Sequence, residues 1–452
     1  MILNKRYSIA PTKYPKHWKQ IRGKYLFNIL DTRSTTGTEE LLSVSHISGI
    51  TPRRLKNVTM FKAESNVGDK VCLTGDIAAN TMWTWQGAIG VSRYDGIVSP
   101  AYNVYRQKED NYNLRFLDIL LREKNLIDIY RILSFGLRPS RLRLYPEQYL
   151  DIYFPVPPRA EQDQIVKYLD WQTSKINTFI KAKKKQIELL KEQRQAIINK
   201  AVTKGLDDTV PMKDSGVEWL GEVPEHWEVN RLKRFCKVNA SISNMIKNYA
   251  DNDQLVFLPM EKVSVNGEID CSEKRLFKDV KSGYSSFAKN DVVIAKITPC
   301  FENGKGAYLD KLETDIGYGT TEFITIRAYA MLNPKYLYLI TMTQYFRLNG
   351  EEQMTGSAGQ KRVSSDFVAN FIQGVPPFEE QQSIVTYLEA KTTLIDKAIT
   401  VIEKEIELVT EYKTSLISSV VTGKVDVQGM IIPAFEVVED ATEDMENEEM
   451  EE

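Results

Sequence analysis

The sequence predicts an α+β protein with a pseudo-twofold internal repeat. Two α/β-mixed globular segments are joined by two long helices that form an antiparallel coiled coil. Three observations predict this fold: a motif that occurs twice, a heptad seam after each copy, and two dissimilar segments of short strands and helices. The chain of 452 residues is long enough for two or more hydrophobic cores.

A duplicated motif defines the repeat. Residues 156–169 begin Val-Pro-Pro-Arg-Ala-Glu-Gln and residues 375–388 begin Val-Pro-Pro-Phe-Glu-Glu-Gln, at an offset of 219 that continues without a gap into the following helix. A shorter Pro-x-His-Trp marker precedes each copy and contains His17 and His226. We expect each His-Trp marker to fix a structural corner that occurs twice.

A long helix is expected after each motif. Paired prolines favour a helix start directly after them, and Gly205 and Gly423 lie where the helices should end. Apolar residues between these limits recur in steps of three, four and seven, which is typical of a coiled-coil seam. The expected seam residues are Ile176, Ile180, Ile187, Leu190 and Ile197 in the first helix and Ile395, Ile399, Ile402, Ile406 and Leu416 in the second.

The two helices are expected to bury their seams against each other. Each would run about 40 residues, or roughly 60 Å at ~1.5 Å per residue, and neither could bury a narrow seam alone. A pseudo-twofold relation between two similar units makes the helices antiparallel. The alternative is that each helix packs only on its own globular segment.

These signals divide the chain into six parts. They are a first globular segment (1–155), a first long helix (156–205), a linker (206–222), a second globular segment (223–374), a second long helix (375–425) and an acidic tail predicted to be disordered (426–452). Residues 436–452 hold ten acids and no base. The rest of the chain has 59 basic against 51 acidic residues, and this excess is compatible with a polyanionic partner.

The sequence lacks the motifs of several enzyme classes. Its four cysteines are scattered without a Cys-x-x-Cys pair, and its three histidines are too spread to suggest a metal site. It has neither a Gly-x-x-x-x-Gly-Lys-Ser/Thr phosphate loop nor a Gly-rich dinucleotide turn. We therefore expect no catalytic residue, metal site or cofactor in this chain. The absence of a secretory signal and of a long apolar run predicts a cytoplasmic location.

Polar and basic loops of the two globular segments are the candidate DNA-binding elements. Arg, Lys, Asn and Gln are the side chains that contact phosphates and base edges, although any one such loop could equally be an ordinary exposed loop. The candidate residues are Arg93, Arg138, Arg141 and Arg143 in the first segment and Lys296, Thr298, Asn303, Lys305, Ser357, Gln360, Lys361 and Arg362 in the second. Trp83 and Trp85, near the first set, are at least as well explained by half-buried packing.

The chain resembles the specificity subunit of type I restriction–modification enzymes over nearly its whole length. The residues that carry the resemblance are the two Val-Pro-Pro motifs with Glu161-Gln162 and Glu380-Gln381, the linker with its marker (residues 210–227), and the loops at 296–305 and 355–362. The acidic tail is not a general feature of that family.

The resemblance implies a role in DNA recognition. Each globular segment would be a target recognition domain that reads one half of a bipartite, asymmetric site in double-stranded DNA, and the helices would form the spacer between them. Two modification subunits would bind S-adenosylmethionine and methylate adenine, and restriction subunits would use ATP and Mg²⁺. This chain would be the non-catalytic specificity subunit, without a cofactor or a membrane of its own.

Two other functions remain compatible with the sequence. The chain could be a coiled-coil adaptor whose two heads bind proteins, in which case DNA affinity would not fall steeply with salt. It could also be a self-sufficient DNA enzyme, in which case it would methylate or cleave DNA alone. The recognised bases cannot be deduced, because readout depends on loop geometry and DNA shape.

Overall fold

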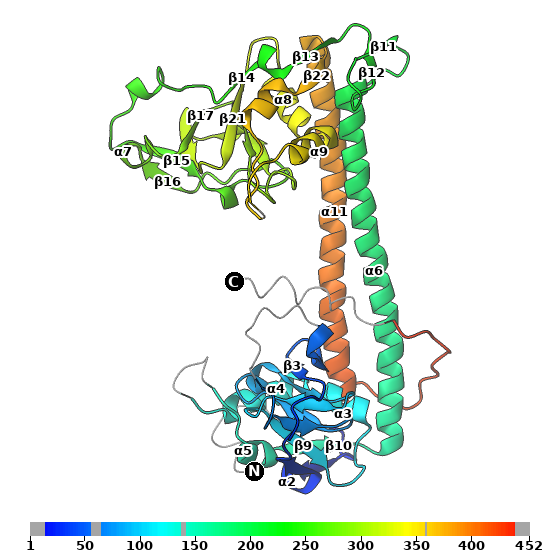
Figure 1. The fold of residues 1–452 in the computed structure, drawn as a ribbon. Coiled ribbons are helices and arrows are strands. Elements are labelled where there is room, and N and C mark those ends of the chain that lie inside the picture. The colour runs from blue at the N-terminus through cyan, green and yellow to red at the C-terminus, as the bar shows by residue number, and fades with distance from the viewer. Residues whose placement is uncertain (1–13, 56–64, 137–141, 358, 439–452) are drawn as a thin grey trace. The chain divides into compact units, whose positions relative to one another are not determined.

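The computed structural model describes residues 14–55, 65–136, 142–357 and 359–438 (Figure 1). Two of the candidate residues, Arg138 and Arg141, lie outside these ranges. The chain forms two compact units: unit 1 comprises residues 1–185 and 403–452, and unit 2 comprises residues 186–402. The division cuts both long helices, α6 (Arg159–Lys204) and α11 (Phe378–Val421), so each unit contains one globular segment and a part of each helix.

The elements of unit 1 other than the long helices are the strands β1 (Lys19–Arg22), β2 (Phe27–Leu30), β3 (Leu42–Ser45), β4 (Gly49–Pro52), β5 (Lys70–Cys72), β6 (Ile77–Ala79), β7 (Ile89–Val91), β8 (Gly96–Val98), β9 (Asn103–Gln107) and β10 (Tyr153–Val156), and the helices α2 (Gly23–Leu26), α3 (Leu114–Leu121), α4 (Lys124–Leu133) and α5 (Pro146–Leu150).

The elements of unit 2 are the strands β11 (Met212–Asp214), β12 (Glu222–Pro224), β13 (Glu228–Arg231), β14 (Cys236–Val238), β15 (Gln254–Leu258), β16 (Lys274–Leu276), β17 (Ser285–Ala288), β18 (Val292–Ala295), β19 (Gly306–Tyr308), β20 (Ile316–Gly319), β21 (Phe323–Ala328) and β22 (Ile372–Val375), and the helices α7 (Phe277–Val280), α8 (Pro334–Thr341), α9 (Gln344–Glu352) and α10 (Ser365–Asn370). The expected linker therefore contains the strand β11, which pairs with β12.

The two globular segments contain the same four-stranded antiparallel sheet although their sequences barely match. The strand order is β2–β9–β6–β7 in unit 1 and β14–β21–β18–β19 in unit 2. Unit 2 adds a second four-stranded sheet, β16–β15–β20–β17, where unit 1 has the two-stranded pairs β3–β4 and β5–β8. The expected α+β fold with an internal repeat is confirmed.

Each shared sheet contains an ion pair between a buried aspartate and a partly exposed arginine at the start of its third strand. Asp76 precedes β6 and accepts two hydrogen bonds from Arg106 on β9, at 2.6 and 2.8 Å. Asp291 precedes β18 and accepts two from Arg327 on β21, both at 2.7 Å. Both carboxylates are about 1% exposed and also accept a backbone N–H bond. The pairs tie neighbouring strands together, because a buried carboxylate must be fully hydrogen-bonded.

The long helices run antiparallel within each unit, where α6 (green) and α11 (orange) lie side by side (Figure 1). In unit 1, Lys183 forms an ion pair with Glu405 at 2.7 Å. In unit 2, Arg194 forms one with Asp396 at 3.0 Å. Of the expected seam residues, Ile176, Ile395, Ile399, Ile402 and Leu416 are buried, and Ile180, Ile187, Leu190, Ile197 and Ile406 are partly buried.

Each long helix begins at the corner of its own repeat and ends at the corner of the other. Gly205, after α6, has a φ of +79° and packs beside Trp227 and Glu380; Gly423, after α11, has a φ of +71° and packs beside Trp18. Glycine is favoured there because positive φ is costly for other residues. The alternative in which each helix packs only on its own segment does not describe these units.

The His-Trp markers form the same corner twice. Glu161, at the start of α6, accepts hydrogen bonds from the Trp18 indole at 3.0 Å and lies 2.8 Å from the His17 ring nitrogen. Glu380 repeats this arrangement with Trp227 and His226, at 3.1 and 2.7 Å. The histidines therefore hold the start of each long helix against its globular segment, and the structure agrees with the structural role expected for them.

The neighbouring glutamine of each motif is a second repeated anchor. The Gln381 side chain is fully buried; it accepts the Asn333 N–H at 2.7 Å and donates to the carbonyl oxygens of Met331 and Pro376. Gln162 makes the equivalent three bonds in unit 1. Each glutamine thereby joins a long helix to the loop before α3 or α8.

The first part of the expected disordered tail is ordered. Gln164 on α6 donates to the carbonyl oxygens of Val427 and Met430, and Val427 is 1% exposed. Further along, Asn177 donates to the Val438 carbonyl at 2.8 Å. Residues 425–438 are mostly uncharged, and Val425, Val427 and Ile432 pack in the hydrophobic core of unit 1. Nine of the ten acids of residues 436–452 lie after Val438. Among the described residues, no helix has the length and apolar character needed to cross a membrane.

Candidate nucleic-acid interface

Two loops of unit 2 that are distant in sequence lie together and form the unit 2 loop pair (residues 296–305 and 355–362). The first follows β18 directly, and the second lies between α9 and α10. The Thr298 N–H donates to the Lys361 carbonyl at 3.0 Å, and the Val363 N–H donates to the Lys296 carbonyl at 2.9 Å. The sheet thus positions both expected basic loops at the end of one strand.

Two of the candidate side chains in this loop pair are engaged within the protein. The Arg362 guanidinium makes two hydrogen bonds to the Glu322 carboxylate, both at 2.9 Å, and thereby lowers the pKa of that carboxyl below its ordinary value. The Thr298 hydroxyl donates to Glu302 at 2.8 Å. Arg362 and Thr298 therefore hold the conformation of the loops. A ligand that contacted Arg362 would have to compete with Glu322 for the positive charge of the guanidinium.

The other candidate side chains of the loop pair are available. Within the described ranges, the side chains of Lys296, Asn303, Lys305, Ser357, Gln360 and Lys361 have neither a hydrogen-bond nor an ion-pair partner. Asn303, Ser357, Gln360 and Lys361 are exposed, and Lys296 and Lys305 are half-buried. The two loops therefore present one exposed lysine and three exposed polar side chains, together with two half-buried lysines.

Sequence reasoning missed the residue that supports the first loop. The Arg347 guanidinium on α9 lies against Gly304, so closely that a β-carbon at that position would overlap it. Gly304 also has a φ of +71°, which favours glycine on conformational grounds. Burial lowers the pKa of Arg347. No sequence signal marks this contact, because it joins positions that are far apart in the chain.

Unit 1 contains an equivalent loop pair, the unit 1 loop pair (residues 80–87 and 142–144). The first loop follows β6, and the Leu144 N–H donates to the Thr81 carbonyl at 3.1 Å. Arg143, which is exposed, forms a backbone bridge with Phe135 and occupies the position that Arg362 holds in the other repeat. Two different sequences thus produce the same arrangement.

The tryptophans of the unit 1 loop pair differ in exposure. Their rings stack with centroids 6.4 Å apart, and Trp83 is 43% exposed. Trp85 is held more firmly, because its indole N–H donates to Met82 and the Arg131 guanidinium covers its ring. The packing role expected for both tryptophans describes Trp85 better than Trp83.

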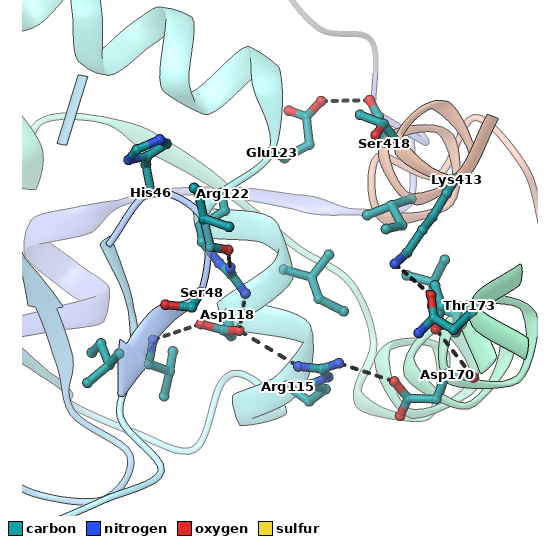
Figure 2. Close-up of a pocket in the computed structure, with 18 of the residues that line it drawn as sticks. His46, Ser48, Arg115, Asp118, Arg122, Glu123, Asp170, Thr173, Lys413 and Ser418 are labelled. Carbon is teal, nitrogen blue, oxygen red and sulfur yellow. Dashed lines mark hydrogen bonds and ion pairs between the residues drawn. The ribbon is translucent and has the colours of Figure 1, made fainter. Parts of the chain in front are cut away.

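Arg93 lines a different feature, the unit 1 groove. This groove has a volume of about 810 Å³ and lies between α3, α4, the two long helices and the ordered part of the tail (Figure 2). Arg122 is bonded to Asp118 at 2.7 Å and Arg115 is paired with Asp170 at 3.5 Å; Figure 2 draws both contacts as dashed lines. The groove therefore contains both basic and acidic side chains.

The described part of the chain contains no group of three or more His, Cys, Asp and Glu side chains arranged to hold a metal ion. Its cysteines are free thiols: Cys72 and Cys236 are buried, and Cys271 and Cys300 are half-buried.

Residues 224–409 match the family described as "Type I restriction modification DNA specificity domain". The matched region comprises most of unit 2, including its loop pair, and most of α11.

Two curated relatives illustrate how far the similarity extends. The specificity subunit of the type I restriction enzyme EcoAI from Escherichia coli is 40% identical over 179 residues, which is 39% of this chain and 30% of that protein. The MjaVIII specificity subunit from Methanocaldococcus jannaschii is 25% identical over 329 residues, 69% of this chain and 74% of that protein. The chain thus aligns with less than a third of the more similar of these two relatives.

Solved structures share the fold. A chain from a study of complex assembly and conformational transition of the type I R-M system superposes with a TM-score of 0.65 at 14% identity, over 92% of this chain and all of that one. The HsdS subunit from Thermoanaerobacter tengcongensis gives 0.51 at 16% identity, over 93% and 100%.

Proposed function

We propose, from the premise that this chain belongs to the family of type I restriction–modification specificity subunits, that it binds double-stranded DNA at a bipartite, asymmetric site. Each loop pair contacts one half-site. The bases are read by side chains of the loops, and the phosphates are contacted by their lysines and arginines.

One observation carries this proposal: both units build a loop pair on the same strand ends from unrelated sequences. In unit 2 the loop pair presents three lysines without partners among the described residues, and in unit 1 it presents Arg143 and an exposed tryptophan. A repeated frame with different contact residues suits one task performed on two different targets.

The first experiment measures DNA affinity at several salt concentrations. If the loops contact phosphates, log K falls linearly with log salt, with a slope of about −0.9 for each phosphate contacted. A head that binds proteins would give DNA affinity that is weak and nearly insensitive to salt. That result would favour the coiled-coil adaptor.

A pair of lysine variants locates the contact. Lys361→Ala, in the unit 2 loop pair, should weaken DNA binding and reduce the salt slope by about one. Lys289→Ala is the matched control, because Lys289 is exposed and precedes the opposite end of β18. Equal effects of the two variants would exclude the loop pair as the contact.

The chemistry is assigned to partner subunits. Two modification subunits supply S-adenosylmethionine-dependent adenine methylation, which requires the base to leave the stack, and restriction subunits supply ATP- and Mg²⁺-dependent cleavage. The lone chain, incubated with DNA, S-adenosylmethionine, ATP and Mg²⁺, should neither methylate nor cleave. Either product would instead support the self-sufficient enzyme.

A further inference from the structure

The ordered part of the tail leads directly to the unit 1 groove. The Val438 N–H donates to the Ser174 hydroxyl at 3.1 Å, and its carbonyl accepts from Asn177. Val437 and Val438 both line the groove. The chain therefore enters its last segment, residues 439–452, from the wall of this groove.

The groove has more positive than negative charge. It is lined by Arg93, Arg115, Arg122, Lys124 and Lys413, against the carboxylates of Asp118, Glu123 and Asp170. Those carboxylates are already used: Asp118 by Arg122, Asp170 by Arg115, and Glu123 by the Ser418 hydroxyl at 2.8 Å (Figure 2). The groove can thus accept further negative charge.

Two of its cations are the most accessible. The side chains of Arg93 and Lys124 are exposed, and neither has a hydrogen-bond or ion-pair partner in the described ranges. The chain continues from Val438 into a segment of 14 residues, 439–452, that contains nine acids and no base. At about 3.3 Å per residue, 14 residues reach at most roughly 46 Å, which is ample for a groove that begins at Val438.

We propose that the acidic segment 439–452 is the occupant of the unit 1 groove, and that it competes with DNA for this basic surface. The competition rests on the proposed function, since it requires DNA to approach Arg93. The segment acts as a tethered polyanion that lowers the affinity for non-cognate DNA, which binds weakly. A cognate site binds more tightly and displaces the segment from the groove.

Occupancy of the groove is tested without DNA. The full-length chain is made with all nine acids of 439–452 changed to the corresponding amides, and a biotinylated peptide copying the native 439–452 is added. A zero-length carbodiimide then joins peptide carboxylates to lysine amines, and mass spectrometry maps the sites. We expect linkage at Lys124, little at Lys289 of unit 2, and several-fold less at Lys124 in the unaltered chain, whose own segment fills the groove.

Two results would overturn occupancy. One is equal linkage at Lys124 and Lys289, and the other is equal linkage in the neutralised and unaltered chains. As a supporting variant, Arg93→Gln in the neutralised chain should reduce linkage at Lys124, because it removes a positive charge without removing the reacting amine. Unchanged linkage in that variant would also count against the groove.

Competition is tested with non-cognate DNA. A tethered segment at millimolar effective concentration should weaken DNA binding by roughly threefold to tenfold. The neutralised chain should therefore bind non-cognate DNA more tightly than the unaltered chain by that factor at low salt. At high salt the two chains should bind equally, because the contacts of the groove with the segment and with DNA are both screened. Equal affinity at low salt overturns the competition. If Lys124 is linked to the peptide but neither chain binds DNA, the proposed DNA function fails and the occupancy of the groove stands. If DNA binds but Lys124 and Lys289 are linked equally, the occupancy fails and the DNA function stands.

Discussion

Replacing the buried glutamine of the second motif provides the sharpest test of how the long helices are anchored. Gln381→Ala leaves the Asn333 N–H and the carbonyl oxygens of Met331 and Pro376 without the partners that they have at 2.7–3.0 Å. An unsatisfied buried polar group costs about 1–3 kcal/mol. Because small shifts and water can restore hydrogen bonds to some of these three groups, we expect the free energy of local opening to fall by about 2–3 kcal/mol in total.

The assay is hydrogen–deuterium exchange of the amides in α8, whose start Asn333 caps. A loss of about 2–3 kcal/mol corresponds to exchange that is roughly 30- to 150-fold faster, at ~1.36 kcal/mol per factor of ten. Peptides from unit 1 serve as the internal reference and should be unchanged, because the affected hydrogen bonds all lie within unit 2.

The adjacent position supplies the matched control. Gln382 is exposed and makes a single side-chain bond, in which it accepts from the Asn333 side chain at 2.8 Å. Gln382→Ala should change exchange in α8 less than about threefold, as expected for a surface substitution worth under ~0.5 kcal/mol. Equal effects of the two alanine variants would refute the anchoring role of the buried glutamine.

Three further predictions follow from the fold. Asp291→Asn should lower the free energy of unfolding by about 2–4 kcal/mol, because it leaves the Arg327 charge without its carboxylate. Faster amide exchange in β18 and β21 would report this loss. Burial raises the pKa of both the Cys72 and Cys236 thiols to about 12, so at pH 8 neither should react with a disulfide reagent until the chain unfolds, whereas the half-buried Cys271 and Cys300 should react; four equally fast thiols would contradict this. On the proposed function, deleting one heptad from each of the long helices α6 and α11 should shorten the spacer of the recognised DNA site and leave both half-sites unchanged. Methylome sequencing with a modification subunit present would detect the change.

The repeat and the long helices could be predicted because their signals are local and periodic. The Val-Pro-Pro motif marks each helix start, the isoleucine steps mark the buried side, and the offset of 219 pairs the two copies. The sequence also indicates a polar loop after a strand at residues 296–305 and a basic loop at residues 355–362. The sequence could not show that backbone hydrogen bonds would bring Thr298 and Lys361 together.

The features that could not be predicted depend on contacts between distant positions. The Asp76–Arg106 and Asp291–Arg327 pairs are structurally equivalent, but insertions between the strands place them at unequal offsets and hide the match. Glu322, which engages Arg362, lies 40 residues away in sequence. The order of residues 425–438 was missed because the acids beyond them dominate the composition of the tail.

The exchange of helix ends between the repeats has a consequence for the ancestry of the protein. Because each compact unit takes the beginning of one long helix and the end of the other, a polypeptide of half this length could not complete either core. A single-repeat ancestor would have needed a second copy of itself to supply the missing helix end of its core.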